Sequence, residues 1–274
     1  MREVLIGFDS AWTDNARAPG AICAVCLTPG QPPVFHEPRL ARFADALAFV
    51  AAVSAGADYL LIGLDQPTIV PNAGSMRPVE RVAASVVSWI GGGVQPANRG
   101  KSGMFCDAAP IWPFLAALDA RDDPQAARGA LGGRFVMEVF PALALASLGP
   151  RFGRRLGAPK YNPANARRFS LEHWRAVCAT AACCFEGWLL AEAAAWCRAA
   201  ADLARPRKAD QDRLDAMLCL AVALHWRRAP ADRSIMIGDL ERGYIVAPAS
   251  PDVRERLFTA ARRTGVAVDG AVPT

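Results

Sequence analysis

Two runs of apolar residues in this chain each end abruptly at an acid. The run Val4–Phe8 is followed by Asp9, and the run Tyr59–Leu64 is followed by Asp65. Short apolar runs of this length, bounded by turn residues, are typical of buried strands. A carboxylate at the end of such a strand leaves the core but is still held by it. Both acids are therefore predicted to be rigidly placed at the edge of a sheet.

The pattern of apolar and polar positions along the rest of the chain predicts a protein of mixed α/β class. Strands are predicted at residues 3–8, 20–27, 33–40, 59–64, 135–140 and 243–246. Helices are predicted at residues 43–55, 79–90, 111–118, 212–228 and from about 251, with two or three Ala-rich helices over 170–204. Residues 91–110 are rich in Gly and Pro and are expected to form a long loop.

A further pair of acids opens the late helix predicted at residues 212–228. Asp212 and Asp215 are three residues apart and therefore share one face of that helix. The helix is apolar on most of its other faces, which predicts that it is buried. For Asp212 a simpler role is open, because an acid in the first helical turn stabilises the helix dipole by ~0.3–1 kcal/mol. Asp210 is expected to be the N-cap.

The composition indicates a large hydrophobic core but does not identify a binding partner. The chain has 274 residues, of which 53% are hydrophobic and 21% charged. We expect one domain over residues 1–274 with insertions at about 66–133 and 150–205. The net charge of +5 is compatible with a polyanionic partner but too small to demonstrate one. The first residues have no signal-peptide pattern and no apolar run approaches ~20 residues, so a cytoplasmic protein without a membrane span is expected.

The eight cysteines do not predict a zinc site. Cys23 and Cys26 have the spacing C-x-x-C, but they fall within the strand predicted at residues 20–27. Residues three apart on a strand point to opposite faces, so the two thiols cannot readily bind one ion. We expect all eight thiols to be reduced.

The order of elements and several short motifs resemble a known family. Three strands, a helix and a fourth strand, with an acid-bearing helix late in the chain, are the order of the ribonuclease H-like fold. The motifs, in chain order, are Gly7-Phe8-Asp9-Ser10-Ala11-Trp12, Gly63-Leu64-Asp65-Gln66-Pro67, Arg77-Pro78-Val79-Glu80-Arg81, Glu138-Val139-Phe140-Pro141, Lys160-Tyr161, Asp212-Arg213-Leu214-Asp215-Ala216 and Gly243-Tyr244-Ile245-Val246-Ala247-Pro248. With them the chain resembles domain-of-unknown-function family 429, the predicted nucleases of ribonuclease H-like fold. The resemblance covers about residues 4–248 and departs at Glu80, where the family often has Asp.

This resemblance implies that the first and fourth strands lie side by side at the centre of the sheet. Asp9 and Asp65 would then meet, and Asp212 and Asp215 would approach from the late helix. Carboxylate oxygens are the ligands that Mg²⁺ and Mn²⁺ prefer. We therefore expect a site for two such ions, with Asp9 bridging them, Asp65 on one ion, and Asp215, helped by Asp212, on the other.

Other candidate site residues carry open alternatives. Glu138 lies within an apolar strand, where an unpaired carboxylate would be costly, so it must face the site as an accessory ligand or pair with an arginine. Arg77 and Arg81 share a helix face and are expected either to bind substrate phosphates or to pair with the acids. Lys160 lies in a basic loop and is expected to contact phosphate, the alternative being a solvated surface. Tyr161 could stack on a base or pack at the rim.

The sequence thus predicts a metal-dependent nuclease that acts on DNA or RNA by two-metal-ion hydrolysis. One alternative is an ATP-binding phosphotransferase of the actin-like branch, because Asp9-x-x-x-Thr13 faintly resembles a phosphate-binding turn. That turn lacks the expected Gly. Another alternative is a nucleic-acid- or nucleotide-binding module that has lost catalysis.

Overall fold

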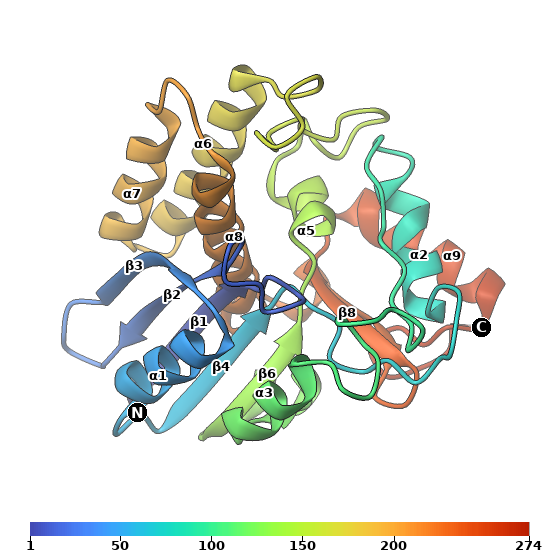
Figure 1. The fold of residues 1–274 in the computed structure, drawn as a ribbon, viewed down its shortest axis with the longest axis horizontal. Helices are drawn as coiled ribbons and strands as arrows, with labels where there is room; N and C mark the ends of the chain where they lie inside the picture. The colour runs from blue at the N-terminus through green and yellow to red at the C-terminus, as the bar shows by residue number, and fades with distance from the viewer. Residues whose placement is uncertain (274) are drawn as a thin grey trace.

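A mixed sheet with helices on both faces organises the chain, in a computed structural model that describes residues 1–273 (Figure 1). The sheet contains β1 (Glu3–Asp9), β2 (Gly20–Leu27), β3 (Val34–Ala41), β4 (Tyr59–Leu64), β5 (Arg121–Asp122) and β6 (Gly133–Glu138). Its strand order is β3-β2-β1-β4-β6-β5. β1, β2 and β3 pair antiparallel, whereas β1, β4, β6 and β5 pair in parallel. The α/β class expected from the sequence is confirmed.

The two faces of the sheet bury different helices, because successive strand residues point to opposite sides. Val4, Ile6 and Phe8 pack with α1 (Phe43–Ser54) and α3 (Ile111–Leu118). Leu5, between them, packs into the cluster formed by α8 (Lys208–Arg228), α6 (Leu171–Gly187) and α7 (Ala191–Ala201). Figure 1 shows α1 and α3 on one side of the sheet and α6, α7 and α8 on the other.

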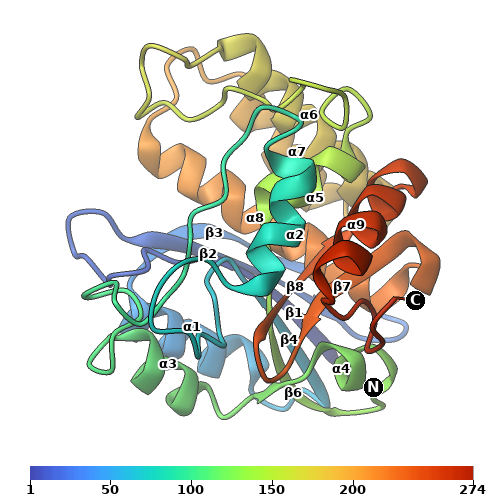
Figure 2. The ribbon, with the colours of Figure 1, turned by 90° about the vertical axis from the view of Figure 1, so that its right-hand side faces the viewer.

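A third group of elements lies beside the sheet, on the side that faces the viewer in Figure 2. It consists of the hairpin β7 (Ser234–Asp239) and β8 (Gly243–Pro248), together with α2 (Pro78–Val87), α5 (Pro141–Leu148) and α9 (Pro251–Thr264). These elements share an apolar cluster of their own. The short helix α4 (Pro124–Gly129) and a 3-10 turn at Ala231–Arg233 complete the chain.

The helix α8 packs directly on β1 and β4 because each strand carries a glycine at the crossing point. Gly7 and Gly63 are partners in the β1–β4 ladder. A Cβ on Gly7 would lie 2.1 Å from the Ala216 carbonyl oxygen and 2.3 Å from the Leu220 nitrogen. A Cβ on Gly63 would lie 2.8 Å from the Cys219 carbonyl oxygen. The backbone of α8 therefore occupies the space that side chains at these positions would fill.

The start of α8 differs from the sequence prediction. The helix begins at Lys208, four residues before the expected start at Asp212. The Arg207 backbone N–H donates to Asp210 Oδ2 at 2.8 Å, which holds the first turn closed. Asp210 is therefore the third helical residue rather than the N-cap. Asp212 lies in the second turn, where the helix dipole gives it little stabilisation.

The two cysteines of the C-x-x-C motif lie as the strand period predicts. Cys23 packs in the cluster under α8, and its Sγ lies 3.3 Å from the Ala216 carbonyl oxygen. Cys26 packs on the other face of the sheet, in the cluster with α1. Within residues 1–273, none of the helices combines the length and the apolar character needed to cross a membrane.

Candidate functional site

Asp9 and Asp65 lie next to each other at the ends of two adjacent parallel strands. Phe8 pairs with Leu64 in the ladder, and the Asp65 N–H donates to the Phe8 carbonyl at 2.9 Å. Phe8 and Leu64 point toward α1. The acid that follows each of them therefore points to the opposite face, which is the face covered by α8.

The acids of α8 reach the same place from above the strand ends. The Asp212 and Asp215 residues are 8% and 7% exposed. Burial, with the neighbouring carboxylates of Asp215 and Asp65, raises the pKa of Asp9 well above its usual range. Burial, Asp215 and Glu138 do the same to the pKa of Asp65. Such mutual shifts arise when like charges share a poorly solvated site, so the four aspartates form one acid cluster: Asp9, Asp65, Asp212 and Asp215.

Both oxygens of Asp215 accept hydrogen bonds from neighbouring side chains. The Tyr161 hydroxyl donates to Oδ1 at 2.7 Å, and Gln211 Nε2 donates to Oδ2 at 2.9 Å. Burial raises the pKa of Asp215 to about 6, and these two hydrogen bonds oppose the rise. Tyr161, for which stacking or rim packing was expected, thus fixes the orientation of an acid in the cluster.

Lys208, a cation next to the acid cluster, was not among the residues predicted from the sequence. Its Nζ donates to Asp212 Oδ1 at 2.5 Å. Its positive charge opposes the pKa rise of all four aspartates of the cluster. The signal was present, because Lys208 is four residues before Asp212, but it could be recognised only with the correct start of α8.

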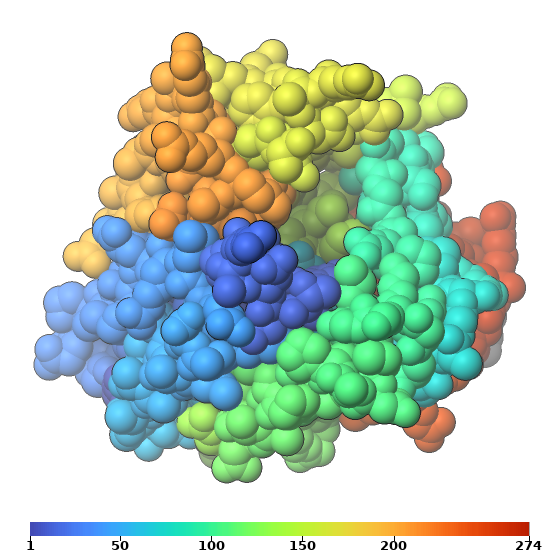
Figure 3. Space-filling model, in the orientation of Figure 1, coloured from blue at the N-terminus to red at the C-terminus, as the bar shows by residue number. Residues whose placement is uncertain are grey.

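Two adjoining cavities give solvent access to the cluster, at the hollow seen near the centre of the face in Figure 3. The larger, of about 420 Å³, is lined by Asp65 and Asp215 among others. The smaller, of about 330 Å³, is lined by Asp9, Asp212 and Lys208 among others. Side chains that line both cavities are those of Trp12 and Gln95. The Trp12 indole N–H donates to the Asp65 carbonyl at 2.9 Å, so this ring is fixed beside the acids.

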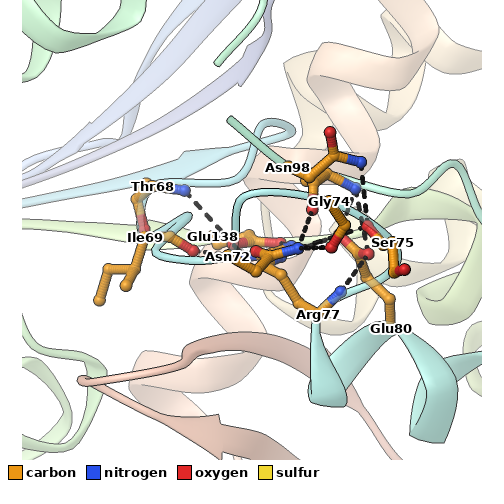
Figure 4. Close-up of polar contacts among 10 residues, drawn as sticks. Thr68, Ile69, Asn72, Gly74, Ser75, Arg77, Glu80, Asn98 and Glu138 are labelled. Carbon is orange, nitrogen blue, oxygen red and sulfur yellow. Dashed lines mark hydrogen bonds and ion pairs between the residues drawn. The ribbon is translucent and has the colours of Figure 1, made fainter. Parts of the chain in front are cut away.

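A buried ion-pair network forms one wall of the larger cavity (Figure 4). The guanidinium of Arg77 donates to both oxygens of Glu138, at 2.8 and 2.6 Å, and through Nε to Glu80 at 2.8 Å. Glu80 also accepts the Ala97 N–H at 3.0 Å, and Glu138 accepts the Thr68 N–H at 3.3 Å. The network therefore ties α2 and β6 to the segment after Asp65 and to the loop at residues 91–110.

The network decides which of the open roles Arg77 and Glu138 take in this structure. Arg77 is 1% exposed, and each guanidinium nitrogen donates to a protein acceptor, so it pairs with acids rather than facing a substrate phosphate. Glu138 pairs with this arginine and lines the larger cavity together with Asp65 and Asp215. Arg81 is exposed on α2, and Lys160 Nζ donates to the Gly91 carbonyl at 2.8 Å. Neither lines the two cavities, so Arg77, held by Glu138 and Glu80, is the one expected phosphate-binding residue of the three that lies beside the acid cluster.

The chemistry of the donors fits a hard divalent cation. Besides the carboxylates, Gln211 lines the larger cavity, and its buried Oε1 accepts no hydrogen bond. Oxygen donors of this kind suit Mg²⁺ or Mn²⁺. Across residues 1–273, however, no three His, Cys, Asp or Glu side chains are arranged to hold a metal ion as they stand. The oxygens of Asp212 and Asp215 are instead engaged by Lys208, Tyr161 and Gln211.

Comparison with known proteins adds a family and nothing more specific. A family model described as "Protein of unknown function (DUF429)" matches residues 7–241, which is most of the chain. No curated protein and no solved structure matches the chain.

Proposed function

We propose that this chain, which belongs to the DUF429 family, is a metal-dependent nuclease that hydrolyses phosphodiester bonds in DNA or RNA. The observation that carries the proposal is the meeting of Asp9 and Asp65, from adjacent strands, with Asp212 and Asp215 from α8. A cleft lined by several carboxylates and open to solvent is suited to holding divalent cations against a phosphate.

The topology supports the more specific fold assignment. The strand order β3-β2-β1-β4-β6, with three antiparallel strands followed by parallel ones, is the order of a ribonuclease H-like fold. A late helix that crosses the first and fourth strands completes the likeness. Because one fold serves many activities, the proposal rests on the acids and not on the topology.

In the proposed mechanism Asp9, Asp65 and Asp215, with Asp212, would hold the cation. When bound, Mg²⁺ or Mn²⁺ would supply the positive charge that stabilises a developing phosphorane and acidifies the attacking water. The chain's own groups do the positioning. Tyr161 and Gln211 orient the carboxylate of Asp215.

A second positioning element lies behind Asp65. Glu138, held by Arg77, accepts the Thr68 N–H and so anchors the segment that follows Asp65. Arg77 and Glu138 therefore support the acid cluster as an ion pair in the wall of the larger cavity.

One observation favours a second candidate, a binding module without catalysis. The oxygens of Asp212 and Asp215 already have donors within the protein, and an acid satisfied in this way can be a structural one. The two candidates differ in catalysis. The nuclease needs a bound cation to cleave its substrate, whereas the binding module cleaves nothing with or without the cation.

Thermal unfolding with and without the cation tests the proposal. A cation that binds only the folded cluster stabilises the protein by about 2.7 kcal/mol at a hundredfold excess over its dissociation constant. We expect millimolar Mg²⁺ or Mn²⁺ to raise the unfolding midpoint of the wild type. Asp9→Asn should abolish the increase, whereas Asp210→Asn, which alters only the acid that accepts the Arg207 N–H, should retain it. Equal responses of wild type and Asp9→Asn would remove the acids from consideration as a metal site.

A cleavage screen separates the two candidates. Wild type and Asp9→Asn are incubated with Mg²⁺ or Mn²⁺ and single-stranded, duplex or branched DNA and RNA. Cleavage by the wild type alone supports the nuclease. A cation-dependent shift in stability without cleavage of any substrate supports the binding module.

A further inference from the structure

Lys208 lies where its charge acts on the whole acid cluster. Its ammonium contacts Asp212, and Asp212, Asp215 and Asp9 in turn raise the pKa of Lys208. The smaller cavity brings Lys208, Asp9 and Asp212 to one solvent-reachable space. The side chain of Lys208 is 50% exposed and that of Asp212 is 11% exposed. The carboxylate is therefore the fixed member of this pair and the ammonium is the member that can move.

Helix stability does not explain a lysine at this position. Lys208 is the first residue of α8, where the helix dipole disfavours a positive charge. The pair Lys208–Asp212 also has the cation on the N-terminal side of the acid, which is the weaker order for residues four apart on a helix. The dipole opposes the lysine and the pair in this order is only weakly stabilising, so the acid cluster as a whole is the better explanation of a lysine here.

We propose that Lys208 is an exchangeable counter-ion, which neutralises part of the acid cluster in the cation-free protein and is displaced when a divalent cation binds. This inference rests on the proposed function, because it requires that the acid cluster binds a divalent cation. It adds a residue that sets how tightly the cluster binds its cation.

The displacement would make one more ligand available at the site. Asp212 Oδ1 is occupied by the ammonium, and moving Lys208 into the adjoining solvent frees that oxygen as a ligand. A divalent ion carries twice the charge of the ammonium and gains more from the same carboxylates.

The test compares Lys208→Gln with Arg207→Gln at low ionic strength. Arg207 is the neighbouring residue, and its exposed side chain contacts none of the four aspartates. Arg207→Gln therefore removes one nearby positive charge without removing a contact to the acid cluster. Mn²⁺ binding is measured by isothermal titration calorimetry and the unfolding midpoint by differential scanning calorimetry. We expect the dissociation constant for Mn²⁺ to fall at least about tenfold in Lys208→Gln and to change less than about twofold in Arg207→Gln.

Stability provides a second readout that is independent of hydrolysis. Without cation, Lys208→Gln should unfold at a lower temperature than wild type, because four acids lose a shared counter-ion. With saturating Mn²⁺ this difference should disappear, because the displaced Lys208 no longer stabilises the wild type. A dissociation constant that is unchanged or higher in Lys208→Gln, in a wild type that binds Mn²⁺, overturns this inference alone. If the wild type binds no Mn²⁺ at all, the proposed function fails and the inference fails with it.

Discussion

Replacing Gly7 with alanine tests whether the close approach of α8 to the sheet builds the acid cluster. The added methyl group would lie 2.1 Å from one backbone atom of α8 and 2.3 Å from another. Neither contact can be relieved by turning a side chain. The helix must instead move away by about 1.4 Å to reach an ordinary separation of ~3.5 Å.

The cost follows from this geometry. Overpacking a well-packed core by one methyl group costs about 1–3 kcal/mol, and a clash with helix backbone belongs at the upper end. Since about 1 kcal/mol shifts the midpoint of a chain of this size by roughly 2–4 °C, Gly7→Ala should lower it by about 6–12 °C. The movement of α8 also carries Asp212 and Asp215 away from Asp9, so the midpoint should lose its response to Mg²⁺ or Mn²⁺.

Two further alanine variants make the measurement a graded series. Gly63→Ala places its methyl group 2.8 Å from the Cys219 carbonyl oxygen and should cost less than Gly7→Ala. Gly187, the last residue of α6, has no atom within 4 Å of an added Cβ, so Gly187→Ala should unfold at or slightly above the wild-type midpoint. Scanning calorimetry of the three variants gives the ranking. Equal midpoints for Gly7→Ala and Gly187→Ala would refute the reasoning that α8 rests on Gly7.

Three further predictions follow from burial and charge. Burial raises the pKa of Asp215 to about 6, so its contribution to stability is present at low pH and is lost as the pH rises through that value. Urea titrations of cation-free protein should therefore show wild type gaining about 1.4 kcal/mol relative to Asp215→Asn between pH 7 and pH 5. Arg77→Met leaves two buried carboxylates without their cation and should cost about 3–5 kcal/mol in chemical denaturation. Arg242→Met, which breaks an exposed pair, should cost no more than about 1 kcal/mol. A thiol reagent at pH 8, followed by mass spectrometry, should modify the exposed Cys183 and leave Cys23 unmodified, because Cys23 is buried and burial raises its pKa; equal labelling of the two would contradict the packing of β2.

The part of the site that lies on the strands could be predicted from the sequence. An apolar run followed by an acid marks both the strand and the side chain that leaves it, and this placed Asp9 and Asp65 correctly at the ends of β1 and β4. The bounds of β2 and α3 also agree with the prediction. These features depend only on local periodicity, which the sequence displays directly.

Features that depend on contacts between distant segments could not be predicted. The start of α8 is fixed by a hydrogen bond from Arg207, a residue type that gives no capping signal. The choice between ligand and ion pair for Glu138 depended on Arg77, which is 61 residues earlier in the chain. The very short elements β5 and α4 were missed because brief runs carry too little periodicity to separate from loops. The elements α5 and β7 were also not predicted, although they are as long as α3 and β4. Gly7 and Gly63 belong to motifs seen in the sequence, but only the structure shows that the backbone of α8 packs directly against them.

The separation of the acids along the chain has a consequence for protein synthesis. Asp9 and Asp65 belong to strands translated early, whereas Asp215 follows about two hundred residues after Asp9. On a growing chain β1 and β4 can pair while the helix that covers Gly7 and Gly63 has yet to leave the ribosome. The cluster therefore cannot assemble until α8 has been translated and has docked. Whatever the acid cluster binds, it can bind only after most of the polypeptide has been made.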